Sequence, residues 1–334
     1  MIYFVCFCIV LILLALIIIY GKTVDINAAL VIISIAVGNG GCYALSVSKG
    51  LEEAILANKL VYVMGAFAPM LAFLIVCNVC KVNIPDKVCA LLYLVQMVIY
   101  ITVCNVGNTD LFYKSIEYHT GPFGVYITKT YGVMHTVFMV VVLIYTVATV
   151  GVGLVSLNRK NVVSRLNVYI LLLADVIVVG TYMLERMVKL KMELLSVSFT
   201  LAAIVMMIPL SKAYRYSTSN VWGIYAEELR NTGYIFFDTK LRFMGYNEQA
   251  AALYPELLEW EMEKKIPGNG GRFNTFLRQP LSEYIRREDA DRSVLSKYNY
   301  KGVTYRYRIA TLRSKSRKKI GYVIWVSDAT GNQE

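Results

Sequence analysis

Seven long apolar segments dominate the first 214 residues of this chain, and each is long enough to cross a lipid bilayer as a helix. Helices are expected because a backbone in lipid finds no water and must satisfy its hydrogen bonds internally. The sequence therefore predicts an α-helical membrane bundle of seven spans over residues 1–214. The predicted spans are Ile2–Tyr20, Ala28–Ser48, Leu60–Cys80, Val88–Val106, Met134–Leu157, Leu166–Val188 and Leu194–Tyr214.

Charged residues are concentrated in the rest of the chain. Residues 1–214 carry 14 Lys and Arg and 9 Asp and Glu, whereas residues 215–334 carry 20 and 14. A chain that is 57% hydrophobic and ends in so polar a stretch is expected to be a membrane domain followed by a water-soluble domain. The positive charge is shared between the two parts, so contact with anionic membrane lipid is a better expectation than nucleic acid binding.

Seven spans place the two ends of the chain on opposite sides of the membrane. We expect a multi-pass protein of the plasma membrane, with the polar C-terminal domain in the cytoplasm and the N-terminus outside. Loop charges discriminate weakly, because the inner loops of this arrangement carry eight Lys and Arg and the outer loops carry seven. The predicted orientation therefore depends mainly on the nature of the C-terminal domain.

The long connection over residues 107–133 predicts an extracellular β-hairpin. Two β-prone runs, LFYKSIEY and GVYITKTY, flank the turn signal HTGPFG. An ordered hairpin here could cap a ligand site between helices, or it could be a simple connector.

Polar side chains in the spans are the candidate sensing residues, since polar groups in a bilayer are costly and usually face the bundle interior. They are Asp175, Gln96, Asn39, Glu185 and Arg186. Asp175 is the carboxylate well inside a span, and Gln96 lies at a similar depth as its candidate partner. Asn39 opens an Asn-Gly-Gly motif that predicts close helix packing or an unwound turn. Sensing of a small molecule, an ion or a membrane-embedded ligand is one interpretation, and structural hydrogen bonds between helices are the other.

The last part of the chain predicts a small α+β domain after a helical connector at residues 215–231. Two short strands, GYIFFD and LRFMGYN, come first, and helical segments and three further strands follow. Asn247 is a suitable N-cap for the first helix, which Pro255 should interrupt. This order predicts a five-stranded antiparallel sheet covered by helices over residues 232–330, with residues 331–334 as a tail.

Two resemblances follow from these segments. The C-terminal order, with NEQAA after the second strand and Asp328-Ala329-Thr330 after the last, resembles a PAS domain. The segments Asn27–Pro69 and KTYGVMHTVF (Lys129–Phe138), with the hairpin, resemble the seven-helix N-terminal region of bacterial sensor histidine kinases and diguanylate cyclases. The resemblance implies a membrane sensor that passes a cue from the bundle to the PAS-like domain. We also expect a homodimer, joined through the linker and PAS-like domain, and a cytoplasmic output protein as partner.

The family's output domain would be expected after Thr330, where this sequence has only GNQE. Both histidines, His119 and His135, lie in the membrane part, and no kinase, cyclase or other catalytic motif is present. We therefore predict an input module and not an enzyme. The PAS-like domain has no cysteine for a flavin adduct and no histidine to ligate haem, so no cofactor is the favoured expectation and a non-covalently bound flavin or small metabolite is the alternative.

A transporter or permease with a regulatory cytoplasmic domain is the alternative. Transport would favour several charged or broken spans and an internal repeat. The sequence has one carboxylate well inside a span and no such repeat, so a sensor is the favoured prediction.

Overall fold

The computed structural model describes residues 1–20, 25–122, 124–159, 161, 163–188, 193–215, 232–267, 272–286, 294–300, 303–313 and 319–328. The chain divides into two compact units, residues 1–156 with 166–211 and residues 157–165 with 212–334. Two predicted features lie outside the described residues: the connector helix beyond residue 215 and the tail over 331–334.

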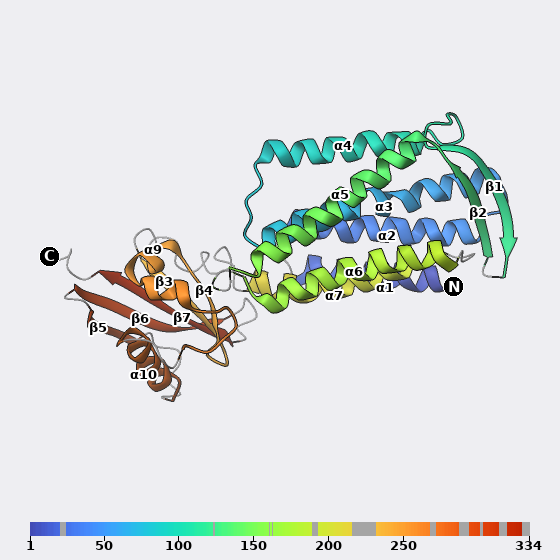
Figure 1. Ribbon diagram of the computed structural model, residues 1–334. Helices are drawn as coiled ribbons and strands as arrows, with labels where there is room; N and C mark the ends of the chain where they lie inside the picture. The colour runs from blue at the N-terminus through green and yellow to red at the C-terminus, as the bar shows by residue number, and fades with distance from the viewer. Residues whose placement is uncertain are drawn as a thin grey trace. The chain divides into compact units, whose positions relative to one another are not determined.

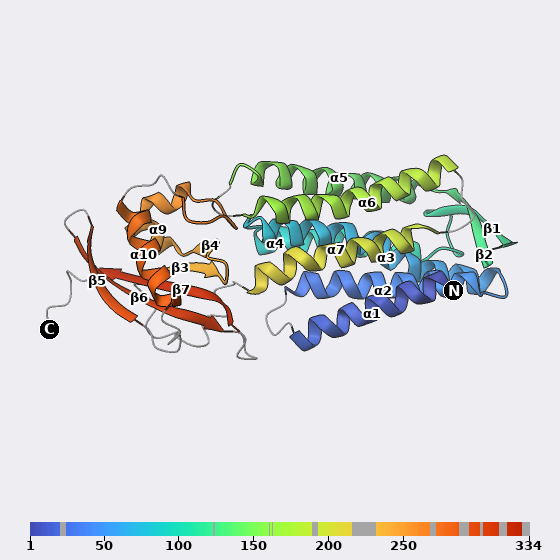
Figure 2. The same cartoon turned by 90° about the horizontal axis from the view of Figure 1, so that it is seen from below.

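The first unit contains seven helices (Figures 1 and 2). They are α1 (Ile2–Tyr20), α2 (Ile26–Ser46), α3 (Leu51–Val79), α4 (Asp86–Cys104), α5 (Val133–Ser156), α6 (Arg165–Val188) and α7 (Leu195–Arg215). Six of them, α1 to α6, are long and apolar enough to cross a membrane, and α7 adds a shorter apolar stretch, Leu195–Ser211. The predicted spans are therefore confirmed as helices, and the protein is a multi-pass membrane protein.

Helix α3 begins at Leu51, well before the predicted start at Leu60. Its first turn carries Glu52 and Glu53, whose negative charges favour the N-terminal end of a helix dipole. Ala54 and Ala57 are buried against neighbouring helices although charged residues surround them in the sequence. The prediction was wrong here because it followed mean hydropathy, and one buried face is enough to stabilise a helix end.

Helices α2 and α3 pack closely through glycines. A Cβ atom added at Gly41 would lie 2.6 Å from the backbone nitrogen of Val61 and 2.9 Å from the carbonyl oxygen of Ala57. A Cβ atom at Gly38 would collide with Met64. Helix α2 is continuous through Asn39, so the Asn-Gly-Gly motif provides close packing and not an unwound turn.

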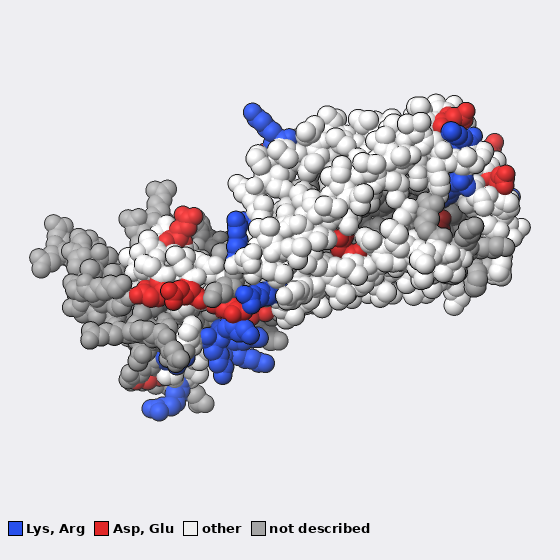
Figure 3. Space-filling view, in the orientation of Figure 1, with Lys and Arg blue, Asp and Glu red and all other residues white. Residues whose placement is uncertain are grey.

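The outer face of the bundle is apolar, as a lipid environment requires. Many large hydrophobic side chains of α1, α4, α5 and α6 are exposed, among them Ile12, Leu94, Val147 and Val176. Figure 3 shows a face of the helices that is almost free of charged atoms, apart from one small acidic patch. Soluble monomeric proteins rarely expose an apolar surface of this extent, so this surface suits contact with lipid.

The predicted hairpin is confirmed as β1 (Tyr113–Gly121) and β2 (Gly124–Tyr131), and its two faces differ. Tyr118 opposes Ile127 and Ile116 opposes Lys129 on the inner face, which packs against α2 and α3. The Tyr118 hydroxyl also donates to the carbonyl oxygen of Ser48 at 2.9 Å. These contacts hold the hairpin against one end of the bundle, called here the hairpin end.

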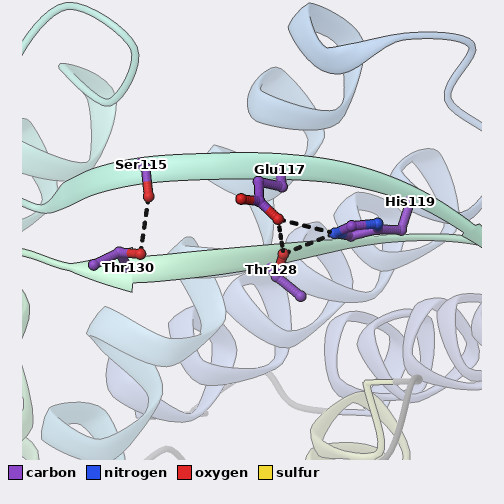
Figure 4. A network of polar contacts seen from close by, with 5 residues as sticks. All are labelled: Ser115, Glu117, His119, Thr128 and Thr130. Atoms are coloured by element: carbon purple, nitrogen blue, oxygen red, sulfur yellow. Dashed lines mark hydrogen bonds and ion pairs between the residues drawn. The ribbon is translucent and has the colours of Figure 1, made fainter.

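The outer face of the hairpin is polar and exposed (Figure 4). The side chain of His119 lies 2.9 Å from the Thr128 hydroxyl and 3.5 Å from a Glu117 carboxylate oxygen. Ser115 donates to the Thr130 hydroxyl at 2.8 Å. The Ser115–Thr130 and His119–Thr128 pairs cross between the strands and stabilise an antiparallel ribbon by roughly 0.2–1 kcal/mol each, whereas Glu117 and His119 lie on the same strand.

The second unit is a five-stranded antiparallel sheet of order β4-β3-β7-β6-β5, and its helices come between β4 and β5 along the chain. Its elements are β3 (Gly233–Asp238), β4 (Phe243–Tyr246), α9 (Glu248–Leu253), the 3-10 helix η1 (Pro255–Glu259), α10 (Arg272–Arg286), β5 (Val294–Tyr300), β6 (Val303–Arg313) and β7 (Lys319–Asp328). The predicted order of strands and helices is confirmed. The core between helices and sheet includes Phe237, Phe243, Tyr254, Trp260 and Tyr322.

Asn247 has the capping role that its place in the sequence predicted. Its Oδ1 atom accepts hydrogen bonds from the backbone nitrogens of Ala250 at 3.0 Å and Tyr234 at 2.9 Å. Its Nδ2 atom donates to the carbonyl oxygen of Thr232 at 2.9 Å. One side chain therefore joins the start of α9 to the start of β3, and Pro255 ends the α-helical stretch as predicted.

Candidate functional site at the hairpin end of the bundle

Lys129 places a positive charge under the hairpin. Side chains alternate between the two faces of β2, and Lys129 lies on the inner face, where its side chain is only 11% exposed. The Nζ atom lies 3.6 Å from Glu193 Oε1 and 5.8 Å from the ring centres of Tyr62 and Tyr113. Burial is the largest single influence and lowers the pKa of Lys129, but Glu193, Tyr62, Tyr131 and Cys42 together outweigh it, so the pKa is raised. The ammonium group is therefore cationic at any physiological pH.

Aromatic rings surround this charge. Tyr62 of α3 contacts Phe112, Tyr113 and Phe138, with ring centres 5.0 to 6.0 Å apart. Tyr131 stacks on His135 at 3.9 Å. Rings offer Lys129 their negative faces without offering a hydrogen bond, so they stabilise a cation that keeps its N–H groups for another partner.

Two buried polar groups, Tyr113 beside Lys129 and Asn58 next to Tyr113, complete no hydrogen bond of normal geometry with the described residues. Asn58 of α3 is fully buried, and its amide interacts with Tyr113 but makes no hydrogen bond of normal geometry to any described residue. The Tyr113 hydroxyl interacts electrostatically with Asn58 and Tyr62 but completes no hydrogen bond of normal geometry. Burial raises the pKa of Tyr113, so its phenol stays neutral. A buried polar group that is left unsatisfied costs about 1–3 kcal/mol, so Asn58 and Tyr113 are candidate binding groups.

The segment just before α7 carries Glu193, the negative partner of Lys129. The backbone nitrogen of Glu193 donates to the hydroxyl oxygen of Tyr3 at 2.9 Å, and that of Leu195 donates to Glu185 Oε1 at 2.9 Å. The first turn of α7 is thus held by α1 and by the end of α6. The bond from Leu195 satisfies one of the backbone N–H groups that a helix start leaves free, and the bond from Glu193 holds the residues that lead into the helix.

One turn further along α7, a buried hydrogen-bond network joins it to α2. The Ser196 hydroxyl donates to Asn39 Oδ1 at 2.7 Å, and Asn39 Nδ2 donates to the Thr200 hydroxyl at 2.9 Å. All three side chains are almost completely buried. Figure 2 shows α7 running beside α2, as this network requires. Both hydrogen-bonding atoms of the Asn39 amide are thereby satisfied.

The structure brings together two of the five predicted site residues, Asn39 and Glu185, at the hairpin end. Asp175 and Gln96 do not pair as predicted. Gln96, on α4, is fully buried and interacts with Tyr145 of α5, whereas Asp175 is half-buried on α6. Depth along the membrane suggested the pairing, but depth does not determine which helices are neighbours. Arg186 lies in α6, and its side chain is outside the described part of the chain.

Sequence reasoning did not identify Lys129, Asn58, Tyr62, Tyr113 or Glu193 as site residues. The signal for Lys129 was the alternation of GVYITKTY, which places it on the same face as Ile127. The others gave no signal, because they come from separate segments and meet only in the folded bundle. No group of three or more metal-binding side chains occurs among the described residues.

Comparison with known proteins gives a family. A family model described as the N-terminal 7TM region of histidine kinase matches residues 2–216. No curated protein matches the sequence. A solved structure of a C-terminal domain from Streptococcus mutans is 15% identical and covers 30% of this chain and 77% of its own, with a TM-score of 0.24, too low to support an argument.

Proposed function

We propose a function for this chain from the premise that it belongs to the family of N-terminal 7TM regions of histidine kinases. In this proposal the chain relays a cue from its hairpin end to its C-terminal domain. Membership of that family makes the protein a membrane sensory input module. The relay to the C-terminal domain is our proposal. The observation that carries it is the Lys129–Glu193 ion pair, because it joins the hairpin to the helix that leads toward residues 232–328.

The physical basis of the relay is a change at the start of α7. Helix α7 is held there by Lys129, Tyr3, Glu185 and the Asn39 network, and it continues to Arg215. A cue that binds two arrangements of these contacts with different affinity shifts the population between them. Because a helix is stiff along its axis, a displacement at one end is felt at the other.

We further propose that the sheet of the C-terminal unit is a PAS domain in the cytoplasm and that the hairpin end is extracellular. The antiparallel five-stranded sheet, the helices after its second strand and the NEQAA segment at α9 support this assignment. The protein then acts as a homodimer on a cytoplasmic output protein and has no catalytic activity of its own.

The test is a fusion of residues 1–330 to the catalytic region of a histidine kinase, assayed by autophosphorylation in membrane vesicles. Lys129→Gln should change the phosphorylation level several-fold, because it removes the contact between hairpin and α7. His119→Gln is the matched control, since His119 lies on the exposed outer face of the same hairpin (Figure 4).

Equal phosphorylation in the parent fusion and in Lys129→Gln, with both proteins folded, would contradict the relay. Solute flux through the unfused chain in proteoliposomes would favour a transporter instead. Autophosphorylation by the unfused chain would refute the absence of catalysis.

A further inference from the structure

Lys129 has hydrogen-bonding capacity that the described residues do not use. An ammonium group has three N–H donors, and Lys129 makes no hydrogen bond to any residue that the structure describes. Its ion pair with Glu193 is 3.6 Å long, whereas a charge-assisted hydrogen bond to a carboxylate is about 2.7–2.9 Å. The Glu193 side chain is 31% exposed, so it approaches the buried cation from the solvent side. Glu193 is thus a loosely held counter-ion that another anion could replace.

The groups beside Lys129 define what that anion would carry. The buried amide of Asn58 interacts with Tyr113 but completes no hydrogen bond of normal geometry to a described residue, so its nitrogen and oxygen can bind a group that is both donor and acceptor. The neutral Tyr113 hydroxyl adds a further donor or acceptor between Asn58 and Lys129. Rings of Phe112, Phe138 and Tyr62 enclose these groups and suit an apolar or aromatic substituent.

We infer that this cluster binds a carboxylate that carries an adjacent amide, and that the bound carboxylate takes the place of Glu193 at Lys129. A peptide C-terminus and an N-acylated amino acid share this chemistry. Lys129 binds the carboxylate, Asn58 binds the amide group next to it, and Tyr113 completes the hydrogen bonds. The inference rests on the proposed function in one respect: it takes the hairpin end as the sensing end.

Exchange at Lys129 connects binding to α7. In the free protein Glu193 neutralises the cation, and in the bound protein the ligand does so and releases Glu193 together with the first turn of α7. The ligand and Glu193 compete for the charge of Lys129. A change that weakens the Lys129–Glu193 pair should therefore raise the affinity for the ligand, and a bound ligand should weaken that pair. This reciprocity separates the proposal from a structural role for the ion pair.

The experiment measures equilibrium binding to the full chain in lipid nanodiscs. The probes are N-acetylphenylalanine and its C-terminal amide, together with the tripeptide Ala-Ala-Phe and its C-terminal amide. The carboxylate probes should bind saturably and at least about tenfold more tightly than the amides, since only they pair with Lys129. Comparison of the tripeptide with the acylated amino acid shows which source of the carboxylate fits better.

Variants give the sharper prediction. Lys129→Gln should abolish binding, and Asn58→Ala should weaken it by about tenfold. Glu193→Gln should tighten binding several-fold, because it removes the competing carboxylate. His119→Gln should bind as the wild type does.

No saturable binding of either carboxylate probe would overturn the inference, and so would equal affinities for acid and amide. Weaker binding by Glu193→Gln would do the same, and this result does not depend on Lys129→Gln being folded. Binding without any change in the output of the kinase fusion would count against the relay and leave the site standing. If the output of the fusion depends on Lys129 but no carboxylate probe binds, the relay is supported and the binding site is refuted.

Discussion

The Nζ atom of Lys129 in β2 lies 3.6 Å from Oε1 of Glu193, two residues before α7 begins at Leu195. This ion pair joins two parts of the chain that are distant in sequence. One partner is enclosed by aromatic rings and the other is open to solvent. Because one partner is partly exposed, breaking the pair should cost less than breaking a fully buried one.

A double-mutant cycle should measure the strength of this pair. Breaking a fully buried ion pair costs about 3–5 kcal/mol. Because Glu193 is partly exposed, we expect about 1–2 kcal/mol for Lys129→Gln. Glu193→Gln should cost as much or more, since it leaves the better-buried charge alone, and the double variant should cost less than the sum. Unfolding in detergent micelles provides the free energies, and additive costs would show that the two residues are not coupled.

The same pair should be insensitive to pH in the neutral range. The raised pKa of Lys129 means that its contribution is complete below the ordinary lysine pKa and is lost only as pH rises through the raised value. The difference in melting temperature between wild type and Lys129→Gln should therefore be equal at about pH 6 and about pH 9. A difference that shrinks by half between these two values would mean that the ammonium group loses its proton there.

Asn39→Ala should loosen α7 from α2. The change removes two buried hydrogen bonds, to Ser196 and Thr200, each worth about 0.6 kcal/mol and at most about 1.7 in a membrane protein. Faster hydrogen exchange over the first half of α7 is the expected result. Ser211→Ala is the control in the same helix, because that hydroxyl is exposed and bonds only to Ile208 within α7. Unchanged exchange in Asn39→Ala would show that the network does not hold the helix.

Gly41→Ala should separate α2 from α3. The added methyl group meets backbone atoms of Val61 and Ala57 that cannot move aside, so we expect a loss of about 1–3 kcal/mol. Gly151→Ala in α5 is the matched control, since no atom lies within 4 Å of a Cβ added there. It should stabilise its helix by up to about 1 kcal/mol. Equal melting temperatures for the two variants would contradict the close packing.

Asn247→Ala should destabilise the start of α9 in the C-terminal unit. Loss of an N-cap side chain costs about 0.5–2 kcal/mol, and here the bond to Tyr234 is lost as well. Asn247→Asp should recover most of that loss, because an aspartate oxygen can still accept from Ala250 and Tyr234. Hydrogen exchange of residues 248–253 in the full chain is the measurement. If the aspartate variant behaves like the alanine variant, the cap is not the source of the stability.

Several local elements could be predicted from the sequence, because their causes are local. The helices follow from apolar runs, the hairpin from alternating residues around a turn signal, and the cap at Asn247 from its place before EQAAAL. The early start of α3 was missed because Ala54 and Ala57 form a buried face in a stretch that is polar on average.

The sequence by itself determined that this protein is a membrane bundle with a hairpin and a polar α+β domain, since periodicity and hydropathy depend on neighbours along the chain. Only the tertiary structure decided the candidate site. Lys129, Asn58, Tyr113 and Glu193 come from β2, α3, β1 and the segment before α7, and nothing in their spacing relates them. Gln96 likewise interacts with Tyr145 and not with Asp175, because helix packing and not position in the sequence brings these residues together. Which polar groups meet inside a bundle depends on helix neighbours and rotations, which packing of the whole fold determines.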